Sequence, residues 1–201
     1  MMGKTPFDFS SVRLQNIPFS HFSAPDFCSN PFASRLLKWF ESGADWKFRR
    51  MENFYVYSDI NLRTSDLPAA LAFLVEESFL TQLRQEVGKL FGVNLKGYVD
   101  VTAHRLGPGD RIRAHSDYTT LRFTHRMLVH VNRGWEPGSG GVLCLLDRDP
   151  KTGGRPRIKP IAPHHRGGFA FEISEKSFHK VTRVTEGERY SLLFSFYPPQ
   201  P

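Results

Sequence analysis

Apolar side chains recur at helical spacing in two stretches of the first half of the chain. The first stretch, residues 31–43, ends at a glycine and carries four apolar residues on one helical face: Phe32, Leu36, Leu37 and Phe40. The second begins at residues 65–68 and repeats up to Gly92 through Phe79, Leu83, Val87 and Leu90. We therefore expect two amphipathic helices, the second interrupted near Glu77.

A run of aromatic and β-branched residues at 54–57 predicts a strand between these helices. From about Gly97, short β-rich runs alternate with clusters of Gly, Pro and Asp. The predicted strands are Tyr98–Leu106, His115–Thr120, Met127–Asn132, Val142–Asp147, Arg157–Ile161, Gly168–Ile173, His179–Val184 and Arg189–Tyr197. This spacing favours a mainly β fold of the α+β kind, with a jelly-roll core behind N-terminal helices.

Composition sets the broad class of the protein. The 201 residues are 40% hydrophobic and 13% aromatic, which excludes a disordered chain and fits one globular domain. Two cysteines, Cys28 and Cys144, indicate neither a disulfide scaffold nor a structural zinc site. The chain shows no secretory leader and no long apolar run, so we expect a cytoplasmic protein without a membrane partner.

Positive charge is concentrated in the second half of the chain. Residues 1–100 carry 11 basic and 11 acidic side chains, whereas residues 101–201 carry 16 basic and 9 acidic ones. This surplus is compatible with nucleic acid, an acidic protein, an anionic small molecule, or a basic surface that is merely solvated.

The segment His115-Ser116-Asp117 is the first candidate for chemistry. Alternate residues of a strand project from one face, so we expect the His115 imidazole and the Asp117 carboxylate to lie together. His179, at the start of a later predicted strand, is the best candidate for a third ligand. Two histidines and one carboxylate with open positions form the facial triad of non-haem Fe(II) oxygenases. An HxD motif alone is weak evidence, because the chain has 8 histidines.

The last predicted strand also separates two kinds of side chain. Tyr190, Leu192, Phe194 and Phe196 form its apolar set, and Arg189, Ser191 and Ser195 belong to the other. If the polar set faces a barrel interior, the buried guanidinium of Arg189 needs an anion to offset its desolvation. A carboxylate bound in bidentate fashion, with a hydrogen bond from Ser191, is the natural partner.

From about Phe79 to Tyr197 the chain resembles the prolyl-hydroxylase-like branch of the Fe(II)/2-oxoglutarate-dependent oxygenases. The resemblance rests on motifs that follow one another in the family's order: GPGD at 107–110, HSDY at 115–118, MLVHVN at 127–132 with Trp135, GGVL at 140–143, GGFAF at 167–171, His179, and Arg189-x-Ser191. Several ordered motifs are far more specific than any one of them.

This resemblance implies a double-stranded β-helix over residues 97–201 and a helical part, 1–96, that packs on it within one domain. It implies that His115, Asp117 and His179 are the catalytic iron ligands. It also implies that Arg189 and Ser191 bind the far carboxylate of the cosubstrate 2-oxoglutarate, which is converted with O2 to succinate and CO2. Because a carboxylate ligand is present, hydroxylation is favoured over halogenation.

The chain departs from the family's pattern at some positions. Many relatives have a tyrosine that bonds to 2-oxoglutarate where this chain has His130, whose imidazole offers the same kind of hydrogen bond. His104 and Arg105 replace tyrosines upstream of the metal strand. Arg105, Arg113 and Arg122 flank the expected mouth, either as a solvated rim or as a site for an anionic substrate group.

The leading functional hypothesis is hydroxylation of an unactivated C–H bond of a residue, with proline one candidate, in a peptide or protein. The alternative is the same chemistry on a free amino acid or a natural-product intermediate, whose substrate is a small molecule. A nucleobase demethylase is disfavoured because such enzymes carry a second arginine six residues after the first, where this chain has Ser195. A non-catalytic jelly-roll binding module is disfavoured because folding does not require this set of polar residues.

Overall fold

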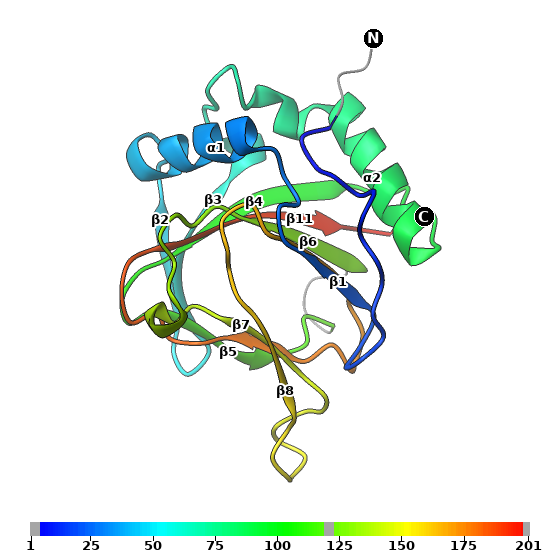
Figure 1. The fold of residues 1–201 in the computed structure, drawn as a ribbon, viewed down its shortest axis with the longest axis vertical. Coiled ribbons are helices and arrows are strands. Elements are labelled where there is room, and N and C mark those ends of the chain that lie inside the picture. The colour runs from blue at the N-terminus through cyan, green and yellow to red at the C-terminus, as the bar shows by residue number, and fades with distance from the viewer. Residues whose placement is uncertain (1–4, 119–122, 199–201) are drawn as a thin grey trace.

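Two layers of antiparallel strands face each other and form a nearly closed barrel in the computed structural model, which describes residues 5–118 and 123–198 (Figure 1). The strands are β1 (His21–Ala24), β2 (Lys47–Met51), β3 (Tyr55–Asn61), β4 (Val99–Leu106), β5 (Arg111–His115), β6 (His125–His130), β7 (Leu143–Leu146), β8 (Ile158–Ile161), β9 (Gly168–Glu172), β10 (His179–Val181) and β11 (Arg189–Phe196). The α-helices are α1 (Asn30–Ser42) and α2 (Glu77–Phe91), and short 3-10 turns cover Leu62–Thr64, Ala72–Val75 and Pro137–Ser139. This architecture confirms the predicted fold class.

The order of the strands explains the two layers. Neighbouring strands follow the order β1-β9-β6-β11-β4-β3-β5-β10-β7-β8, and β2 pairs with β3 at the side. We call β1, β9, β6, β11 and β4 the covered sheet, because α1 and α2 lie over its outer face (Figure 1). We call β5, β10, β7 and β8 the open sheet, because no described helix lies over it in Figure 1.

Strand β11 lies at the centre of the covered sheet, where it pairs with β4 on one side and β6 on the other. Its two faces belong to different environments. Leu192 and Phe194 join the apolar cluster between this sheet and the helices, whereas Leu193 joins the cluster inside the barrel. Arg189 and Ser191 have the same parity as Leu193, so they face the interior.

The two helices bury apolar faces as predicted, but their limits differ. Pro31 stands in the first turn of α1 and Gly43 follows its last residue, in agreement with the predicted 31–43. The second helix begins only at Glu77, not at residues 65–68. The intervening chain turns so that Leu71 and Leu74 are buried, and this packing prevails over helical propensity.

The helical part expected at 1–96, with one strand at 54–57, also supplies two strands that were not predicted, β1 and β2. The predicted strand 54–57 is the start of β3, which continues to Asn61. Strand β1 extends the covered sheet through pairing with β9, and every residue of β2 is exposed. A short edge strand and a fully exposed strand carry no alternation of apolar and polar residues by which a sequence reveals them. The single domain stays a prediction.

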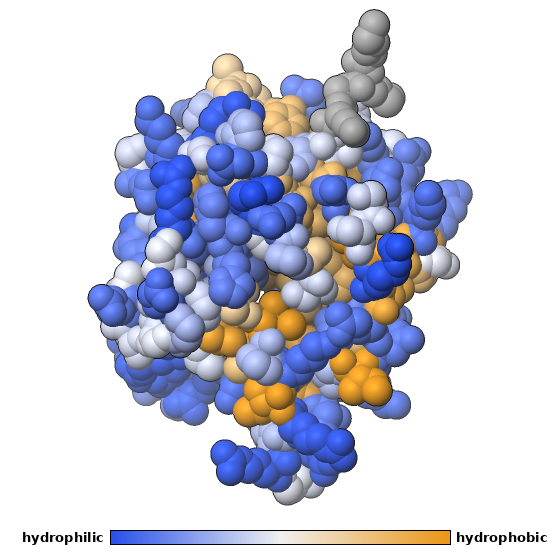
Figure 2. All heavy atoms as spheres, in the orientation of Figure 1, coloured by the Kyte–Doolittle hydropathy of each residue, from blue (hydrophilic) through white to orange (hydrophobic). Residues whose placement is uncertain are grey.

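The surface is hydrophilic over most of the face in Figure 2, with apolar patches near β8 and the lower part of β1. Ile17 and Ile158 are exposed large apolar residues of these regions of the chain. No helix among the described residues is long and apolar enough to cross a membrane.

Candidate active site

Three of the predicted residues meet at one end of the barrel. His115 is the last residue of β5 and lies opposite His179, the first residue of β10. Asp117 follows two residues after β5 and places one carboxylate oxygen 3.3 Å from Nε2 of His115 and the other 3.6 Å from Nε2 of His179. The three ligand atoms all lie within 4.8 Å of one another. One metal ion can therefore contact all three side chains.

The prediction that one strand presents both His115 and Asp117 is wrong. Strand β5 ends at His115, and Asp117 adopts a left-handed backbone conformation with φ of 62°. The turn, rather than the pleat, directs the carboxylate back towards the imidazole. Aspartate tolerates this conformation better than most residues. The remainder of the predicted strand, residues 119–120, lies outside the described residues.

Hydrogen bonds fix which nitrogen of each histidine faces the centre of the site. Nδ1 of His115 lies 2.8 Å from the carbonyl oxygen of Arg113, and Nδ1 of His179 lies 2.8 Å from that of Ser177. A carbonyl only accepts, so each Nδ1 donates its proton to that oxygen and each ring turns Nε2 towards the centre of the site. Burial lowers the pKa of His179 to about 3, which keeps this imidazole neutral. Both rings are thus oriented to bind a metal through Nε2.

Arg126, which the sequence analysis missed, binds the third ligand. Its Nη1 donates to Oδ2 of Asp117 across 2.8 Å, and the Asp117 side chain is only 7% exposed. Burial alone would raise the pKa of Asp117, but Arg126 and the two histidines hold it well below its usual range. Arg126 stands among apolar residues of β6. Its charge at this position is the only feature of the sequence that indicates a buried acidic partner. The carboxylate is therefore ionised and held in place.

Arg189 lies inside the barrel with 3% of its surface exposed. Its Nε and Nη2 have no hydrogen-bond partner among the described residues, and burial lowers its pKa to about 10. Gly141 makes room for it, because a Cβ at this glycine, whose φ is 67°, would come 2.9 Å from the Arg189 side chain. A buried cation with free donors is costly unless an anion binds it.

Ser191 and His130 lie beside each other on neighbouring strands. Nδ1 of His130 is 3.0 Å from Oγ of Ser191, and Nε2 of His130 is buried without a partner. Burial lowers the pKa of His130 well below its ordinary value, and the charge of Arg189 adds to this effect. The second predicted set, Arg189, Ser191 and His130, is thus also brought together.

His104 is a further histidine of the site, and it responds to charges in both parts of it. It pairs with Ser191 across the β4–β11 ladder, and its ring stacks on Tyr57 at 4.4 Å. Burial lowers the pKa of His104 to about 3, with further lowering by the charges of Arg126 and Arg189. The guanidinium groups of Arg126, beside the metal-ligand candidates, and of Arg189, beside Ser191, therefore both lower the pKa of His104 inside the barrel.

The residues present fit Fe(II) and 2-oxoglutarate. Two imidazoles and an ionised carboxylate form a facial ligand set that leaves coordination positions open. The unpartnered donors of Arg189 fit the carboxylate at the far end of a 2-oxo acid.

The three arginines expected at the mouth have different surroundings. Arg105 lies 4.0 Å from Glu188 and 5.9 Å from the centre of the Trp46 ring. Arg113 is exposed in the middle of β5, and Arg122 lies outside the described residues.

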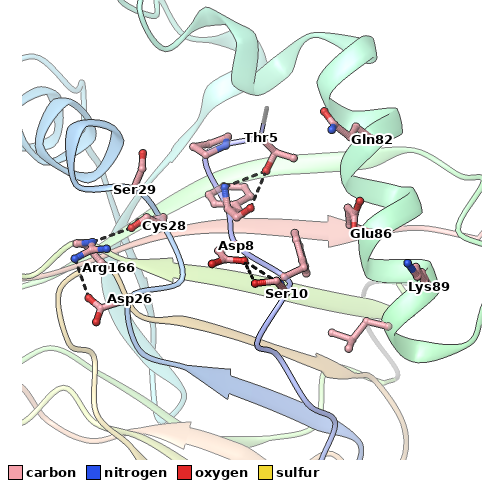
Figure 3. A pocket seen from close by; sticks show the side chains of 14 residues that line it. Thr5, Asp8, Ser10, Asp26, Cys28, Ser29, Gln82, Glu86, Lys89 and Arg166 are labelled. Atoms are coloured by element: carbon pink, nitrogen blue, oxygen red, sulfur yellow. Dashed lines mark hydrogen bonds and ion pairs between the residues drawn. The ribbon is translucent and has the colours of Figure 1, made fainter. Parts of the chain in front are cut away.

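A separate cavity of about 940 Å³ lies outside the barrel, between the N-terminal segment and α2 (Figure 3). Three of its charged side chains, Asp8, Asp26 and Arg166, are engaged within the chain. Arg166 forms an ion pair with Asp26 and donates to the carbonyl oxygen of Cys28, and Asp8 accepts from Ser10. None of the predicted site residues lines this cavity.

The model of the 2OG-Fe(II) oxygenase superfamily matches residues 101–197, which include both polar sets. This match supports membership of the chain in that superfamily. The predicted family and its cofactors, Fe(II), 2-oxoglutarate and O2, are therefore confirmed.

Two relatives of this oxygenase are similar over most of its length. It is 28% identical to the mouse protein named Prolyl 3-hydroxylase OGFOD1 over 98% of the chain, and 27% identical to the Xenopus laevis protein of that name over 88%. These matches cover 36% and 34% of the two relatives, so the chain spans about a third of their length.

Solved oxygenase structures share the fold. A Pseudomonas putida prolyl-4-hydroxylase superposes with a TM-score of 0.70 at 18% identity, covering 89% of this chain and 92% of that one. A Trichoplax adhaerens prolyl hydroxylase, solved with a peptide of hypoxia inducible factor, superposes with a TM-score of 0.67 at 14% identity, covering 88% and 83%.

Proposed function

We propose that this oxygenase hydroxylates a prolyl residue in a peptide or protein, using Fe(II), 2-oxoglutarate and O2. The observation that carries the proposal is the pairing, in one barrel, of a metal-ligand cluster with a buried arginine whose donors lack partners. The named activities of the relatives, prolyl 3-hydroxylase and prolyl hydroxylase, favour proline as the target. A cytoplasmic location remains part of the proposal.

Bound Fe(II) and 2-oxoglutarate would supply the oxidising power: O2 and the 2-oxo acid yield succinate and CO2, and one oxygen atom enters the substrate C–H bond. His115, Asp117 and His179 would hold the metal through two imidazole nitrogens and one carboxylate oxygen. Arg126 keeps the Asp117 carboxylate in position.

Arg189 would hold the far carboxylate of the cosubstrate, with Ser191 as a second donor. Because this end of the site is buried, the ion pair forms in a medium that screens charge less than water does. His130 keeps the Ser191 hydroxyl oriented through their hydrogen bond. The apolar barrel interior, including Leu106, excludes bulk water from the reacting groups.

The first experiment adds Fe(II) and 2-oxoglutarate to the protein without oxygen and measures the visible absorption band of the metal chelate. We expect a band in the wild type, no band in His179→Ala, and a much higher 2-oxoglutarate requirement in Arg189→Ala. Absence of a band in the folded wild type would refute the assignment of the site.

The second experiment tests the substrate. Proline-containing peptides are incubated with the complete system, and we expect succinate formation together with a peptide mass increase of one oxygen atom located on proline. If succinate forms with free amino acids but with no prolyl peptide, the substrate is a small molecule and the proposed peptide substrate is wrong.

A further inference from the structure

A groove of about 810 Å³ runs along the outside of the open sheet next to the metal-ligand candidates. It extends from the turn between β2 and β3, at Asn53 and Phe54, across β5 and β10 to the loop at residues 149–151. His115 and Ser116 line one part of it, so the groove reaches the residues of the active site. Its volume lies within the range of ligand-binding clefts.

Four cations line this groove: Arg111, Arg113, Lys151 and Lys180. They come from three separate segments, namely β5, β10 and the loop after β7. Among the described residues none of the four forms an ion pair, whereas other surface arginines such as Arg49 do. A concentration of unpaired like charge creates a positive potential that attracts a ligand of opposite charge.

The groove holds one acidic side chain, Asp149, which is engaged with the backbone. Its Oδ1 accepts from the amide of Lys151 at 2.8 Å, so it neutralises none of the four cations directly. Two aromatic residues, Phe54 and Phe178, are half-buried in the walls. Phe54 packs edge-on against His115 with 5.1 Å between ring centres. The groove thus combines cationic side chains with apolar contact area beside the site.

We propose that this groove binds an acidic stretch of the substrate polypeptide, with its Asp or Glu side chains on Arg111, Arg113, Lys151 and Lys180, so that the residue to be oxidised is held at the His115 end. This inference rests on the proposed function, because that function makes the substrate a polypeptide. The groove gives the enzyme a preference for acidic residues in the substrate sequence, which the metal and cosubstrate sites do not provide.

Peptide fits the groove better than nucleic acid does. Phe54 is half-buried and packs against the rings of Tyr55 and His115, and Phe178 is also half-buried, whereas single-stranded nucleic acid is bound by bases stacking on open aromatic faces. The four cations also lie along a single cleft rather than over a broad surface. Carboxylates on an extended peptide match separate arginines and lysines, and arginine can bind each in bidentate fashion.

The test uses three fluorescein-labelled peptides, each with a central proline flanked by glutamate, glutamine or lysine, and measures binding by fluorescence anisotropy. The protein carries Mn(II) and 2-oxoglutarate so that no turnover occurs. We expect the glutamate peptide to bind more tightly than the glutamine peptide by about tenfold, with the advantage lost at high salt. The lysine peptide is expected to bind most weakly.

The variant that removes the charge is Arg111→Gln/Arg113→Gln/Lys180→Gln, and its matched control is Arg35→Gln/Lys38→Gln/Lys89→Gln on the helical side. The control residues are exposed and lie away from the groove. We expect the groove variant to lose the preference for the glutamate peptide and the control to keep it. Equal effects of both triple variants would overturn the proposal, since only net charge would then matter.

A charge reversal keeps the proposal testable if the triple variant folds poorly. Arg113→Glu/Lys180→Glu changes one exposed and one half-buried side chain and should reverse the preference, so that the lysine peptide binds more tightly. No change in preference would refute the groove. An oligo-thymidine is tested in the same way. If it binds more tightly than the glutamate peptide and the same variants abolish its binding, the ligand of the groove is nucleic acid and not an acidic peptide.

The outcomes separate this inference from the proposed function. If a prolyl peptide is hydroxylated but charge has no effect on binding, the groove proposal fails and the function stands. If the glutamate peptide binds through the groove but no peptide supports succinate formation, the groove stands and the hydroxylase proposal fails.

Discussion

The two faces of the covered sheet have opposite chemistry although they share the same strands. On the outer face, Leu192 and Phe194 of β11 join an apolar cluster beneath the helices. On the inner face, Arg189 is buried with unpartnered donors, and Arg126 holds Asp117. The outer face is packed mainly with apolar side chains, although Nε2 of His125 is buried there without a partner, whereas the inner face gathers buried charged groups. A buried cation whose donors lack partners therefore indicates where an anion binds, and a packed apolar cluster indicates stability.

The largest effect is expected on the outer face. Phe194 is fully buried with its ring 5.9 Å from that of Phe7, so Phe194→Ala should reduce the free energy of unfolding by about 4 kcal/mol. Urea denaturation measures this loss, and Phe194→Leu is the milder control. A loss below about 1 kcal/mol would mean that this face is not the stabilising one.

The inner face should respond in the opposite way. Arg189→Met removes a buried charge without a protein partner, so the free protein should keep its stability or gain slightly. Binding of 2-oxoglutarate should weaken about a hundredfold, equivalent to roughly 3 kcal/mol. Calorimetric titration and thermal melting measure the two effects separately. A variant that unfolds would show that Arg189 is a structural residue.

A histidine on the outer face allows a test by pH. Burial lowers the pKa of His125 to about 4, below the unfolded value of 6.5. Between these values the unfolded state binds a proton that the folded state does not, so stability is present near pH 7 and is lost as the pH falls. From pH 7 to pH 5 this group accounts for about 2 kcal/mol.

His125→Phe should therefore lose about 2 kcal/mol less stability than the wild type over that pH interval. Urea denaturation at both pH values measures the difference. The exposed His164→Gln serves as the control and should follow the wild-type curve. Parallel curves for wild type and His125→Phe would contradict the neutral, buried state of this ring.

The smallest effect concerns the orientation of a metal ligand. Arg126→Met leaves the Asp117 carboxylate without its partner at 2.8 Å, and we expect Mn(II) affinity to fall about tenfold. Arg126→Lys should restore part of it. Tighter metal binding in Arg126→Met would show that the positive charge opposes the metal more than the hydrogen bond orients the ligand.

Strong patterns in the sequence anticipated the inner and outer faces of β11. Its alternation of large apolar and polar residues separates the faces because the strand is long and buried on both sides. The same kind of reasoning failed at Asp117, whose position depends on a turn with positive φ rather than on strand periodicity. It also missed Arg126, because a pairing between β6 and the turn after β5 arises only when distant segments meet.

Local signals also failed where tertiary packing decided the outcome. Residues 65–68 have the features of a helix start, but burial of Leu74 holds the following segment in a short turn, and α2 begins at Glu77. Strand β2 has no apolar alternation, since all five of its own side chains are exposed where it pairs with β3.

The direct pairing of His115 with His179 gives a bound metal a mechanical role. These residues stand opposite each other on β5 and β10, strands of the sheet that no described helix covers. An ion held by both would act as a cross-link between the strands and stabilise the native state through ligand linkage. Metal loading should therefore slow amide hydrogen exchange in β5 and β10 far more than in β11, so that the cofactor helps to complete the fold that binds it.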